Sequence, residues 1–380
     1  MILIKNIHVY APEDLGIKDV FVSGEKITLI ENEIPAFHKD IKVIDGKGKI
    51  LIPGLIDNHV HITGGGGEGS FKSRVPEITL SKLLKGGITT VVGLLGTDGS
   101  TRNIENLVAK AKALKEEGLS AYVHTGSYAY PPISLTGSPG KDILFVEEVL
   151  GVKIALSDHR SSSITNNELA RLASEVRVAG MLSAKPGIVV VHMGEGKRGL
   201  EPILEILDST DLPIKTFRPT HVNRNPQLLK QALAFAKKGG NIDLTCGEKN
   251  ELSTASVLRQ AEKLMVPREN ITLSSDGYGS FSDYDQFGNL SHIGVASVSI
   301  LFKELRDLVL VEGFDLERAL IFFTSNVAKA LHLYPDKGCI KENSHADLLI
   351  LDKDLALSSL IARGRLLLHK KELLVKGTYE

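Results

Sequence analysis

The sequence predicts an α/β fold: a (β/α)8 barrel of the TIM type with a small β-rich domain formed by both chain termini. Three observations lead to this prediction. Apolar runs of strand length alternate with helical patterns through the middle of the 380-residue chain, and both ends contain strand patterns without helices. The turn after the first barrel strand also lacks a glycine-rich phosphate-binding fingerprint, which disfavours the alternative, a doubly wound open sheet.

The two ends of the chain have the same character. Near the start, the runs 19–22 and 26–30 flank Ser23-Gly24-Glu25, a hairpin signal. Near the end, strand-like runs lie at 346–351, 366–368 and 372–375, the last two around a basic turn. We therefore expect residues 1–49 and 337–380 to form one small β domain, and residues 50–336 to form the barrel.

The middle of the chain contains eight apolar runs that we interpret as barrel strands. They lie at 50–56, 89–95, 121–125, 152–156, 188–192, 214–221, 241–245 and 271–275. Helical patterns between them lie at 103–117, 167–178, 228–238 and 255–265. Gly118 closes the first of these helices, and Lys-Lys-Gly-Gly at 237–240 is a C-cap signal. Eight strands separated by helices match a (β/α)8 barrel.

Composition excludes several classes of function. The chain has 45 basic and 46 acidic residues, 5% aromatic residues and no Trp, so we expect neither a nucleic-acid nor an anionic-membrane partner. Two cysteines, Cys246 and Cys339, are too few for a disulfide framework and suit the reducing cytoplasm. The N-terminus lacks a signal-peptide pattern, and no apolar run approaches the ~18 residues of a membrane span. These features predict a cytoplasmic protein.

The clearest chemical motif is Asp57-Asn58-His59-Val60-His61, directly after the first predicted barrel strand. Residues two apart in a strand point to the same side, so His59 and His61 aim two imidazoles at one point. Such a pair is typical of a metal site with a preference for Zn²⁺. The alternative is two polar residues at a strand end.

Lys153 lies within an apolar strand, where an unpaired ammonium group would be costly or would lose its proton. One interpretation is that it reaches the strand end and pairs with Asp158 or another acid. The other is a neutral lysine that accepts CO₂ and becomes a carbamate, an anionic ligand able to bridge two metal ions.

Three more residues of metal-ligand type end predicted strands: His192, His221 and Asp276. Taken singly, such histidines are usually core or cap residues, and such an aspartate is usually a turn residue. Together with the first motif and Lys153, however, they mark the carboxyl ends of strands one, four, five, six and eight. That end of the barrel is where active sites form, so we predict a metal site there.

This order of ligands resembles the amidohydrolase superfamily with a dinuclear metal centre. Residues 54–61 (GLIDNHVH) are similar to its entry motif, and the tail from Gly338 to Leu348 is similar to its return into the small β domain. Further motifs resemble the bacterial isoaspartyl (β-aspartyl) dipeptidases over nearly the whole chain. They are 64–68 (GGGGE), 92–98 (VGLLGTD), 157–161 (SDHRS), 219–225 (PTHVNRN) and 274–277 (SSDG).

The resemblance implies a zinc-dependent dipeptidase that hydrolyses β-aspartyl dipeptides. Two Zn²⁺ ions are implied, one held by His59, His61 and Asp276. His192 and His221 would hold the other, with carboxylated Lys153 and a hydroxide as bridges. In the implied mechanism the hydroxide attacks the isopeptide carbonyl, and Asp276 takes its proton and delivers it to the leaving amine.

A β-aspartyl dipeptide has one ammonium and two carboxylate groups to bind. Glu68 can bind the ammonium, and Arg160 and Arg224 can bind the carboxylates. The resemblance adds Tyr128 as the donor to the oxyanion, and it completes the pocket with Gly66, Gly67, Thr97 and Ser280. The structural alternatives are salt bridges for the arginines, and a flexible glycine turn with Glu68 in solvent.

Two other functions remain open at this point. One is a cyclic-amide hydrolase of the dihydropyrimidinase or dihydroorotase kind, which shares the metal ligands but not the Gly-Gly-Gly-Gly-Glu loop. The other is a non-catalytic scaffold on the same fold, which the complete ligand set disfavours. By analogy with the family we expect a homo-oligomer.

Overall fold

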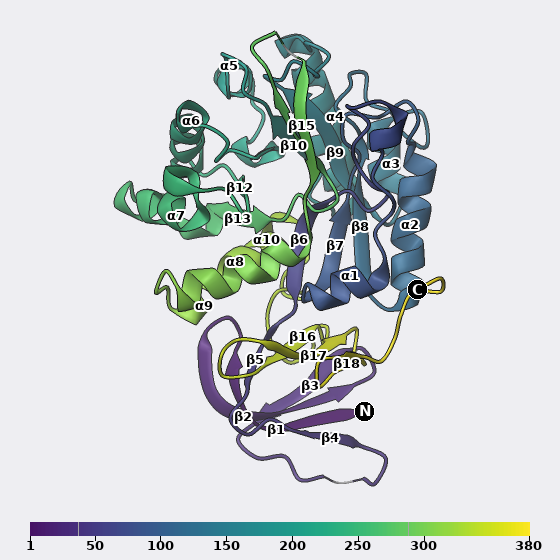
Figure 1. Ribbon diagram of the computed structural model, residues 1–380, viewed down its shortest axis with the longest axis vertical. Helices are drawn as coiled ribbons and strands as arrows, with labels where there is room; N and C mark the ends of the chain where they lie inside the picture. The colour runs from purple at the N-terminus through teal and green to yellow at the C-terminus, as the bar shows by residue number, and fades with distance from the viewer. Residues whose placement is uncertain (37, 288) are drawn as a thin grey trace.

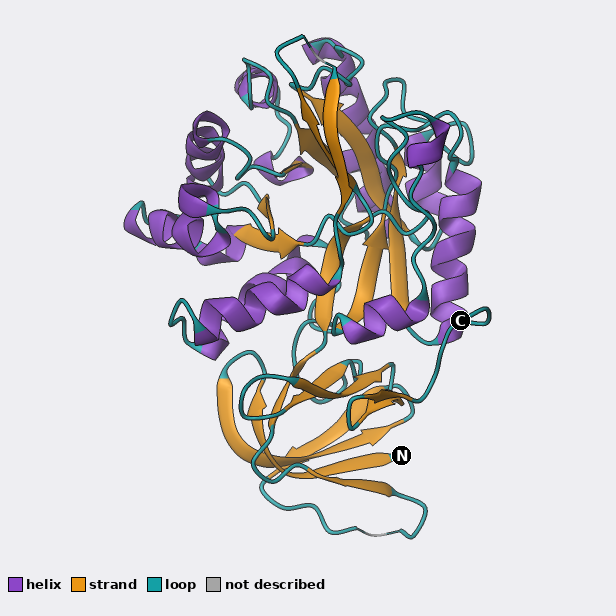
Figure 2. Cartoon of the chain, in the orientation of Figure 1, coloured by secondary structure: helices purple, strands orange, loops and turns teal. Residues whose placement is uncertain are grey.

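The computed structural model describes residues 1–36, 38–287 and 289–380 and places a barrel above a separate β-sheet (Figures 1 and 2). The barrel strands are β6 (Leu55–Val60), β7 (Ile88–Gly93), β8 (Ser120–Gly126), β9 (Val149–Leu156), β10 (Ile188–Met193), β11 (Phe217–Thr220), β12 (Ile242–Thr245) and β13 (Ile271–Ser274). Each strand pairs in parallel with the next one along the chain. The ring closes where Val60 bridges to Gly277, next to a 2.9 Å hydrogen bond from the His61 N–H to the Gly277 carbonyl. The predicted (β/α)8 barrel is confirmed.

The helices are α1 (Leu80–Lys85), α2 (Ile104–Glu117), α3 (Pro139–Phe145), α4 (Asn166–Ser183), α5 (Glu201–Ser209), α6 (Pro226–Lys237), α7 (Thr254–Lys263), α8 (Ser299–Leu310), α9 (Leu316–Leu320) and α10 (Ser325–Ala330). The four helices that the sequence predicts are α2, α4, α6 and α7. Their starts have side-chain caps: Asn103, Thr165 with Glu168 in a capping box, Asn225 and Ser253. No helix among the described residues is both long and apolar enough to cross a membrane.

Both chain termini build the second sheet, as predicted. Its strands are β1 (Ile2–Tyr10), β2 (Asp14–Ser23), β3 (Lys26–Glu31), β4 (Lys42–Asp45), β5 (Ile50–Pro53), β16 (Leu348–Leu351), β17 (Leu357–Ala362), β18 (Arg365–His369) and β19 (Glu372–Leu373). The order is β19-β18-β17-β16-β5-β1-β2-β3, with β4 also paired to β1. The β2–β3 hairpin turns at Gly24, where the sequence predicts it.

The expected strand at 50–56 is two strands, which is a correction. The first, β5, pairs with β1 and β16 in the terminal sheet, and only β6 enters the barrel. The two meet at Gly54, whose N–H donates to the Asp347 carbonyl at 2.7 Å. A Cβ atom at Gly54 would lie 2.2 Å from the Thr89 hydroxyl oxygen, so the passage between the sheets needs a residue without a side chain.

The expected strand at 214–221 is also shorter than predicted. Residues Ile214–Thr216 form a 3₁₀ turn, and β11 covers only Phe217–Thr220. Proline explains part of the difference, because Pro213 precedes the turn and Pro219 cannot donate a hydrogen bond within the strand. His221 therefore follows the strand, with a left-handed backbone (φ 60°).

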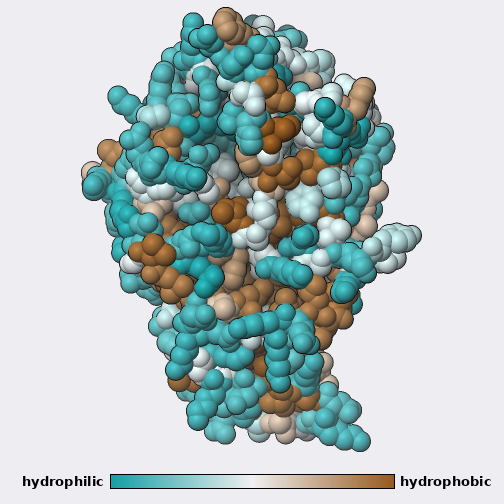
Figure 3. Space-filling model, in the orientation of Figure 1, coloured by the Kyte–Doolittle hydropathy of each residue, from teal (hydrophilic) through white to brown (hydrophobic). Residues whose placement is uncertain are grey.

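The barrel interior changes character along its length. Within the barrel, Ile56, Val92 and Val190 belong to one apolar cluster with Val327 of α10. Toward the carboxyl ends the buried side chains are polar, among them Lys153 and His192. On the side of the molecule shown in Figure 3, hydrophilic residues cover most of the terminal sheet. Hydrophobic residues gather along the barrel and at its junction with the sheet. The buried polar groups thus lie at the end where barrel enzymes bind substrate.

Candidate active site

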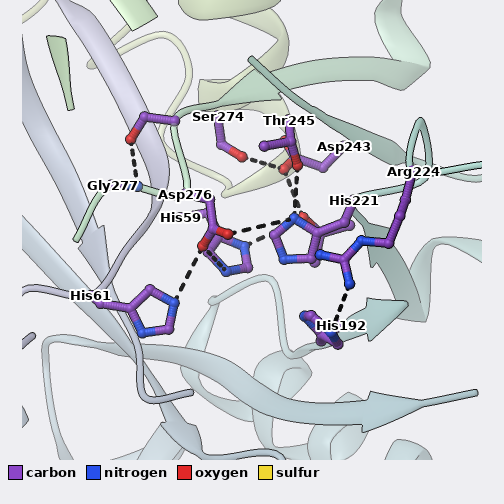
Figure 4. Close-up of polar contacts among 12 residues, drawn as sticks. His59, His61, His192, His221, Arg224, Asp243, Thr245, Ser274, Asp276 and Gly277 are labelled. Atoms are coloured by element: carbon purple, nitrogen blue, oxygen red, sulfur yellow. Dashed lines mark hydrogen bonds and ion pairs between the residues drawn. The ribbon is translucent and has the colours of Figure 1, made fainter. Parts of the chain in front are cut away.

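The six predicted metal ligands come from five strands and converge at the carboxyl end of the barrel. His59, Lys153 and His192 lie on β6, β9 and β10, whereas His61, His221 and Asp276 lie just beyond β6, β11 and β13. All are buried except Asp276, whose side chain is 18% exposed. Figure 4 shows His59, His61 and His221 around the Asp276 carboxylate, with His192 to one side.

Asp276 lies at the centre of this cluster. Its Oδ1 is 3.4 Å from His59 Nε2 and 3.3 Å from His61 Nε2, and its Oδ2 is 4.0 Å from His221 Nδ1. One ligand atom from each of His59, His221 and Asp276 lies within 4.8 Å of the others. Among the described residues, Asp276 Oδ1 and His61 Nδ1 are buried without a hydrogen-bond partner. Imidazole nitrogens and a carboxylate oxygen gathered in this way fit a divalent cation.

Burial also keeps these histidines in the form that binds metal. It lowers the pKa of His59, His192 and His221 well below the usual value, and the charge of nearby Lys153 adds to the shift in each case. Neutral imidazoles at neutral pH are ready ligands, because no proton has to leave before a metal ion binds.

Lys153 has an unusual environment for a lysine. It is fully buried, its Nζ lies 3.1 Å from His59 Nε2, and no carboxylate of the described residues forms an ion pair with it. Burial lowers the pKa of Lys153 to about 7, although Asp276 and Asp243 oppose the shift. Asp158, the partner considered for it from the sequence, instead accepts two hydrogen bonds from the Arg160 guanidinium group, at 2.8 and 2.9 Å.

Both ring nitrogens of His192 have protein partners outside the metal-ligand cluster. Nδ1 is 2.6 Å from the Tyr128 hydroxyl and Nε2 is 3.0 Å from Asp158 Oδ2. Its ring centroid is 4.8 Å from that of His221. The structure thus brings His192 beside the cluster, and it adds Asp158 as a neighbour that the sequence analysis did not place in the site.

Asp243 of β12 is a second residue that the sequence analysis missed. This fully buried carboxylate accepts hydrogen bonds from four side chains, at 2.6–3.0 Å: Asn58, Thr220, Thr272 and Ser274. The Thr220 hydroxyl in turn lies 3.4 Å from His59 Nδ1. Asp243 therefore links β11 and β13 to β6, across the place where β13 and β6 close the barrel. Its signal in the sequence, a charged residue within an apolar strand, is the one that singled out Lys153.

A cavity of about 610 Å³ opens beside the cluster. The predicted site residues on its wall are His61, Gly66, Glu68, Thr97, Tyr128, Arg160, His192, Arg224, Asp276 and Ser280. Gly67 is not among the lining residues. The cavity is large enough for a small-molecule substrate, and its wall has charges of both signs.

Glu68 is held inside this cavity, not in solvent. Its Oε1 accepts hydrogen bonds from Thr97 at 3.0 Å and Ser280 at 2.9 Å and lies 3.5 Å from Arg160 Nη1. Its other oxygen, Oε2, is buried with no partner among the described residues. Arg160 both forms the salt bridge to Asp158 and faces the cavity, and Arg224 Nη1 lies 3.5 Å from His192 Nε2.

One wall of the cavity was not predicted from the sequence. It is a hairpin of β14 (Ser280–Tyr284) and β15 (Leu290–Val295), which rises in front of the barrel in Figure 1. The hairpin packs over the glycine loop, where a Cβ at Gly69 would lie 3.2 Å from Leu290, and its Tyr284 ring contacts His159. Residues 246–249 line the cavity nearby.

Comparison with known proteins agrees with this geometry. The model of the amidohydrolase family matches residues 50–367. The chain superposes with a TM-score of 0.93 and 42% identity on the crystal structure of β-aspartyl dipeptidase from Fervidobacterium islandicum AW-1 in complex with the β-Asp-Leu dipeptide, over 98% of each chain.

Two sequence relatives have other activities. The chain is 25% identical to a 5'-deoxyadenosine deaminase from Methanocaldococcus jannaschii, over 93% of this chain and 86% of the deaminase. It is 37% identical to a dihydroorotase from Elusimicrobium minutum, over 74% of this chain and 62% of the dihydroorotase.

Proposed function

The chain belongs to the amidohydrolase family, and we propose that within this family it hydrolyses β-aspartyl dipeptides. One observation supports this substrate above others: a buried carboxylate, Glu68, and two guanidinium groups, Arg160 and Arg224, face the cavity that contains the candidate metal ligands. Among the charged groups of this wall, Glu68 can pair with the ammonium of such a dipeptide, and Arg160 and Arg224 can pair with its two carboxylates. The 42% identical dipeptidase that was solved with β-Asp-Leu supports the same choice.

We propose two Zn²⁺ ions as cofactors, one with His59, His61 and Asp276 and the other with His192 and His221. Bound there, the ions would supply a water of lowered pKa and would polarise the scissile carbonyl. His192 would have to exchange its contact with Asp158 for the metal.

Lys153 would join the two positions after carboxylation. Its neutral amine attacks the carbon of CO₂, an N–C bond forms, and one N–H proton leaves to solvent. The product is an anionic carbamate with two oxygen ligands. Lys153 forms no ion pair with a carboxylate of the described residues, and its pKa is about 7. Both facts favour the neutral amine that this step needs.

The remaining residues bind, orient and move protons. Asp276 is placed to accept the proton of the nucleophilic water and to pass it to the leaving amine. Burial raises the pKa of Tyr128, so its phenol remains a hydrogen-bond donor for the developing oxyanion. Glu68 binds the ammonium group, with Thr97 and Ser280 fixing its orientation.

This arrangement discriminates between linkage isomers. In an α-linked aspartyl dipeptide the ammonium and the free carboxylate take different places around the scissile carbonyl. Glu68 and the arginines then cannot all be paired, and buried charges without partners reject a ligand strongly. A cyclic amide, the substrate type suggested by the dihydroorotase relative, has no ammonium group for Glu68.

The test compares isoAsp-Leu with Asp-Leu on the zinc-loaded enzyme, with dihydroorotate and a hydantoin as controls. We expect hydrolysis of the β-linked isomer, with kcat/KM at least about 100-fold above that of the α-linked isomer. Comparable rates on the two isomers, or a preference for a cyclic amide, would overturn the proposal.

A further inference from the structure

A second cavity, of about 590 Å³, opens at the opposite end of the barrel, where the strands begin. It lies between α4, the start of β10, the turn before β11, the start of β12 and the end of α10. Its lining residues are Arg177, Pro186, Ile188, Pro213, Ile214, Lys215, Thr216, Gly239, Asn241, Glu269, Lys329, Ala330 and His332. None of them belongs to the candidate active site.

The charges around this cavity are unbalanced. Arg177, Lys215 and Lys329 come from three separate elements, and Glu269 is the one acidic residue of the lining. Within the described part of the chain, none of the three cations forms an ion pair with Glu269 or with any other carboxylate, although Lys329 Nζ lies 5.0 Å above the Tyr334 ring. Arg268, next to Glu269 in the chain but outside the lining, is paired with Glu262 at 2.5 Å.

The same positive charges affect the pKa of His332. Burial lowers its pKa, and Arg177 and Lys215 lower it further. Lys215 and Lys329 are exposed and Arg177 is half-buried. A bound anion would offset the excess of positive charge that Glu269, the acidic residue of this lining, leaves unbalanced.

The rest of the wall suits the organic part of a ligand. Pro186, Ile188, Pro213 and Ile214 supply apolar surface, and the volume falls in the range of small-molecule sites. A free inorganic ion would leave this apolar surface uncovered.

We propose that this cavity is a binding site for a small organic phosphate, with the phosphate between Lys215, Lys329 and Arg177 and the organic part against the prolines and isoleucines. The site is independent of the hydrolytic reaction and lies at the far end of the barrel from it. Lysine ammonium and arginine guanidinium groups are the usual partners of phosphate oxygens.

Isothermal titration with adenosine monophosphate (AMP), inorganic phosphate and adenosine tests the proposal on the zinc-loaded full chain. We expect AMP to bind more tightly than phosphate and adenosine not to bind. Lys215→Gln and Lys329→Gln should each weaken AMP binding at least about threefold, and the double variant about tenfold. Lys230→Gln, which removes an exposed charge of α6 outside the cavity, should leave the affinity unchanged.

An unchanged melting temperature in each variant confirms that the fold is intact. Equal AMP affinity in the double variant and in Lys230→Gln would overturn the proposal, because binding would then occur elsewhere, for example at the metal centre. No binding of AMP to the wild-type chain, or binding of adenosine as tight as that of AMP, would also overturn it.

Discussion

The molecule buries two lysines in opposite ways. At the junction of the terminal sheet with the barrel, Lys337 is 4% exposed and its Nζ lies 2.6 Å from Asp347 and 2.7 Å from the Ser120 hydroxyl. In the candidate active site, Lys153 is fully buried and contacts the ring nitrogen of His59, with no ion pair among the described residues. Asp347 also accepts a hydrogen bond from the Arg363 N–H at 2.8 Å, so both of its carboxylate oxygens have partners.

The two lysines show how a buried polar group with a structural role differs from one with a proposed functional role. A buried ion pair that is complete within the chain holds two parts of the fold together and leaves nothing free to react. At the active site, by contrast, several buried polar atoms have no hydrogen-bond partner among the described residues, including His61 Nδ1, Asp276 Oδ1 and Glu68 Oε2. Such atoms are costly unless a ligand completes them, which supports the proposed positions of metal and substrate.

The largest expected effect comes from exchanging the two lysines for methionine one at a time. Lys153→Met keeps the volume and removes the bridging ligand, so dipeptidase kcat/KM should fall by about 1000-fold or more while the protein stays folded. Lys337→Met leaves Asp347 buried without its cation, so unfolding should become easier by about 3–5 kcal/mol while the folded fraction keeps its activity.

Steady-state kinetics and urea denaturation measure the two variants side by side. Added acetate or propionate with zinc should restore part of the activity of Lys153→Met only, because a free carboxylate can replace the carbamate. If both variants lost only stability, or both lost only activity, the division into a structural lysine (Lys337) and a functional lysine (Lys153) would be wrong.

A smaller effect is expected when Glu68, whose Oε2 has no hydrogen-bond partner among the described residues, loses its charge. Glu68→Gln keeps the side chain's size and its contacts with Thr97 and Ser280, but it removes the partner of the substrate ammonium. We expect kcat/KM for isoAsp-Leu to fall by about 100-fold, with metal content unchanged by elemental analysis. Glu248→Gln, on the same cavity wall, is the matched control and should change kcat/KM by less than about threefold. Equal losses in the two variants would contradict the role given to Glu68.

The smallest effect concerns the pH dependence of stability in metal-free protein. The pKa of Lys153 is about 7 in the folded chain, against 10.5 for an ordinary lysine. Between these values the unfolded chain binds a proton that the folded chain does not. The free energy of unfolding due to this group therefore rises with pH, and its destabilising effect is complete below about pH 7.

Comparison with Lys153→Met isolates this contribution. In chelator-treated, CO₂-free samples, wild type should gain stability relative to the variant as the pH rises from about 7 to about 10. Urea denaturation at several pH values measures the difference. A difference that stays constant with pH would show that Lys153 titrates like an exposed lysine.

Most of the barrel could be predicted from the sequence because strand and helix patterns are local. The β2–β3 hairpin and the capped helices α2 and α6 are also set by neighbouring residues. The division of 50–56 at Gly54 could not be predicted in this way, because it depends on the approach of Thr89 and Asp347, which lie far along the chain.

The candidate site, like the fold, could be predicted from the sequence only in part. His59, His61 and Asp276 could be identified because strand ends and residue types are visible in the sequence. The network of Asp243, the contact between Asp158 and His192, and the β14–β15 hairpin over the cavity depend on which loops meet above the barrel. These contacts join residues far apart in the sequence, so a local pattern cannot predict them.

The central claim is that Lys153, which forms no ion pair with a carboxylate of the described residues, is itself carboxylated to a carbamate. Carbon-13 NMR of enzyme loaded with zinc and ¹³C-bicarbonate, together with elemental analysis of the same sample, tests it most directly. We predict one carbamate carbon per chain with two zinc ions, and loss of that signal in Lys153→Met. An active enzyme with two zinc ions and an unmodified Lys153 amine would contradict the claim.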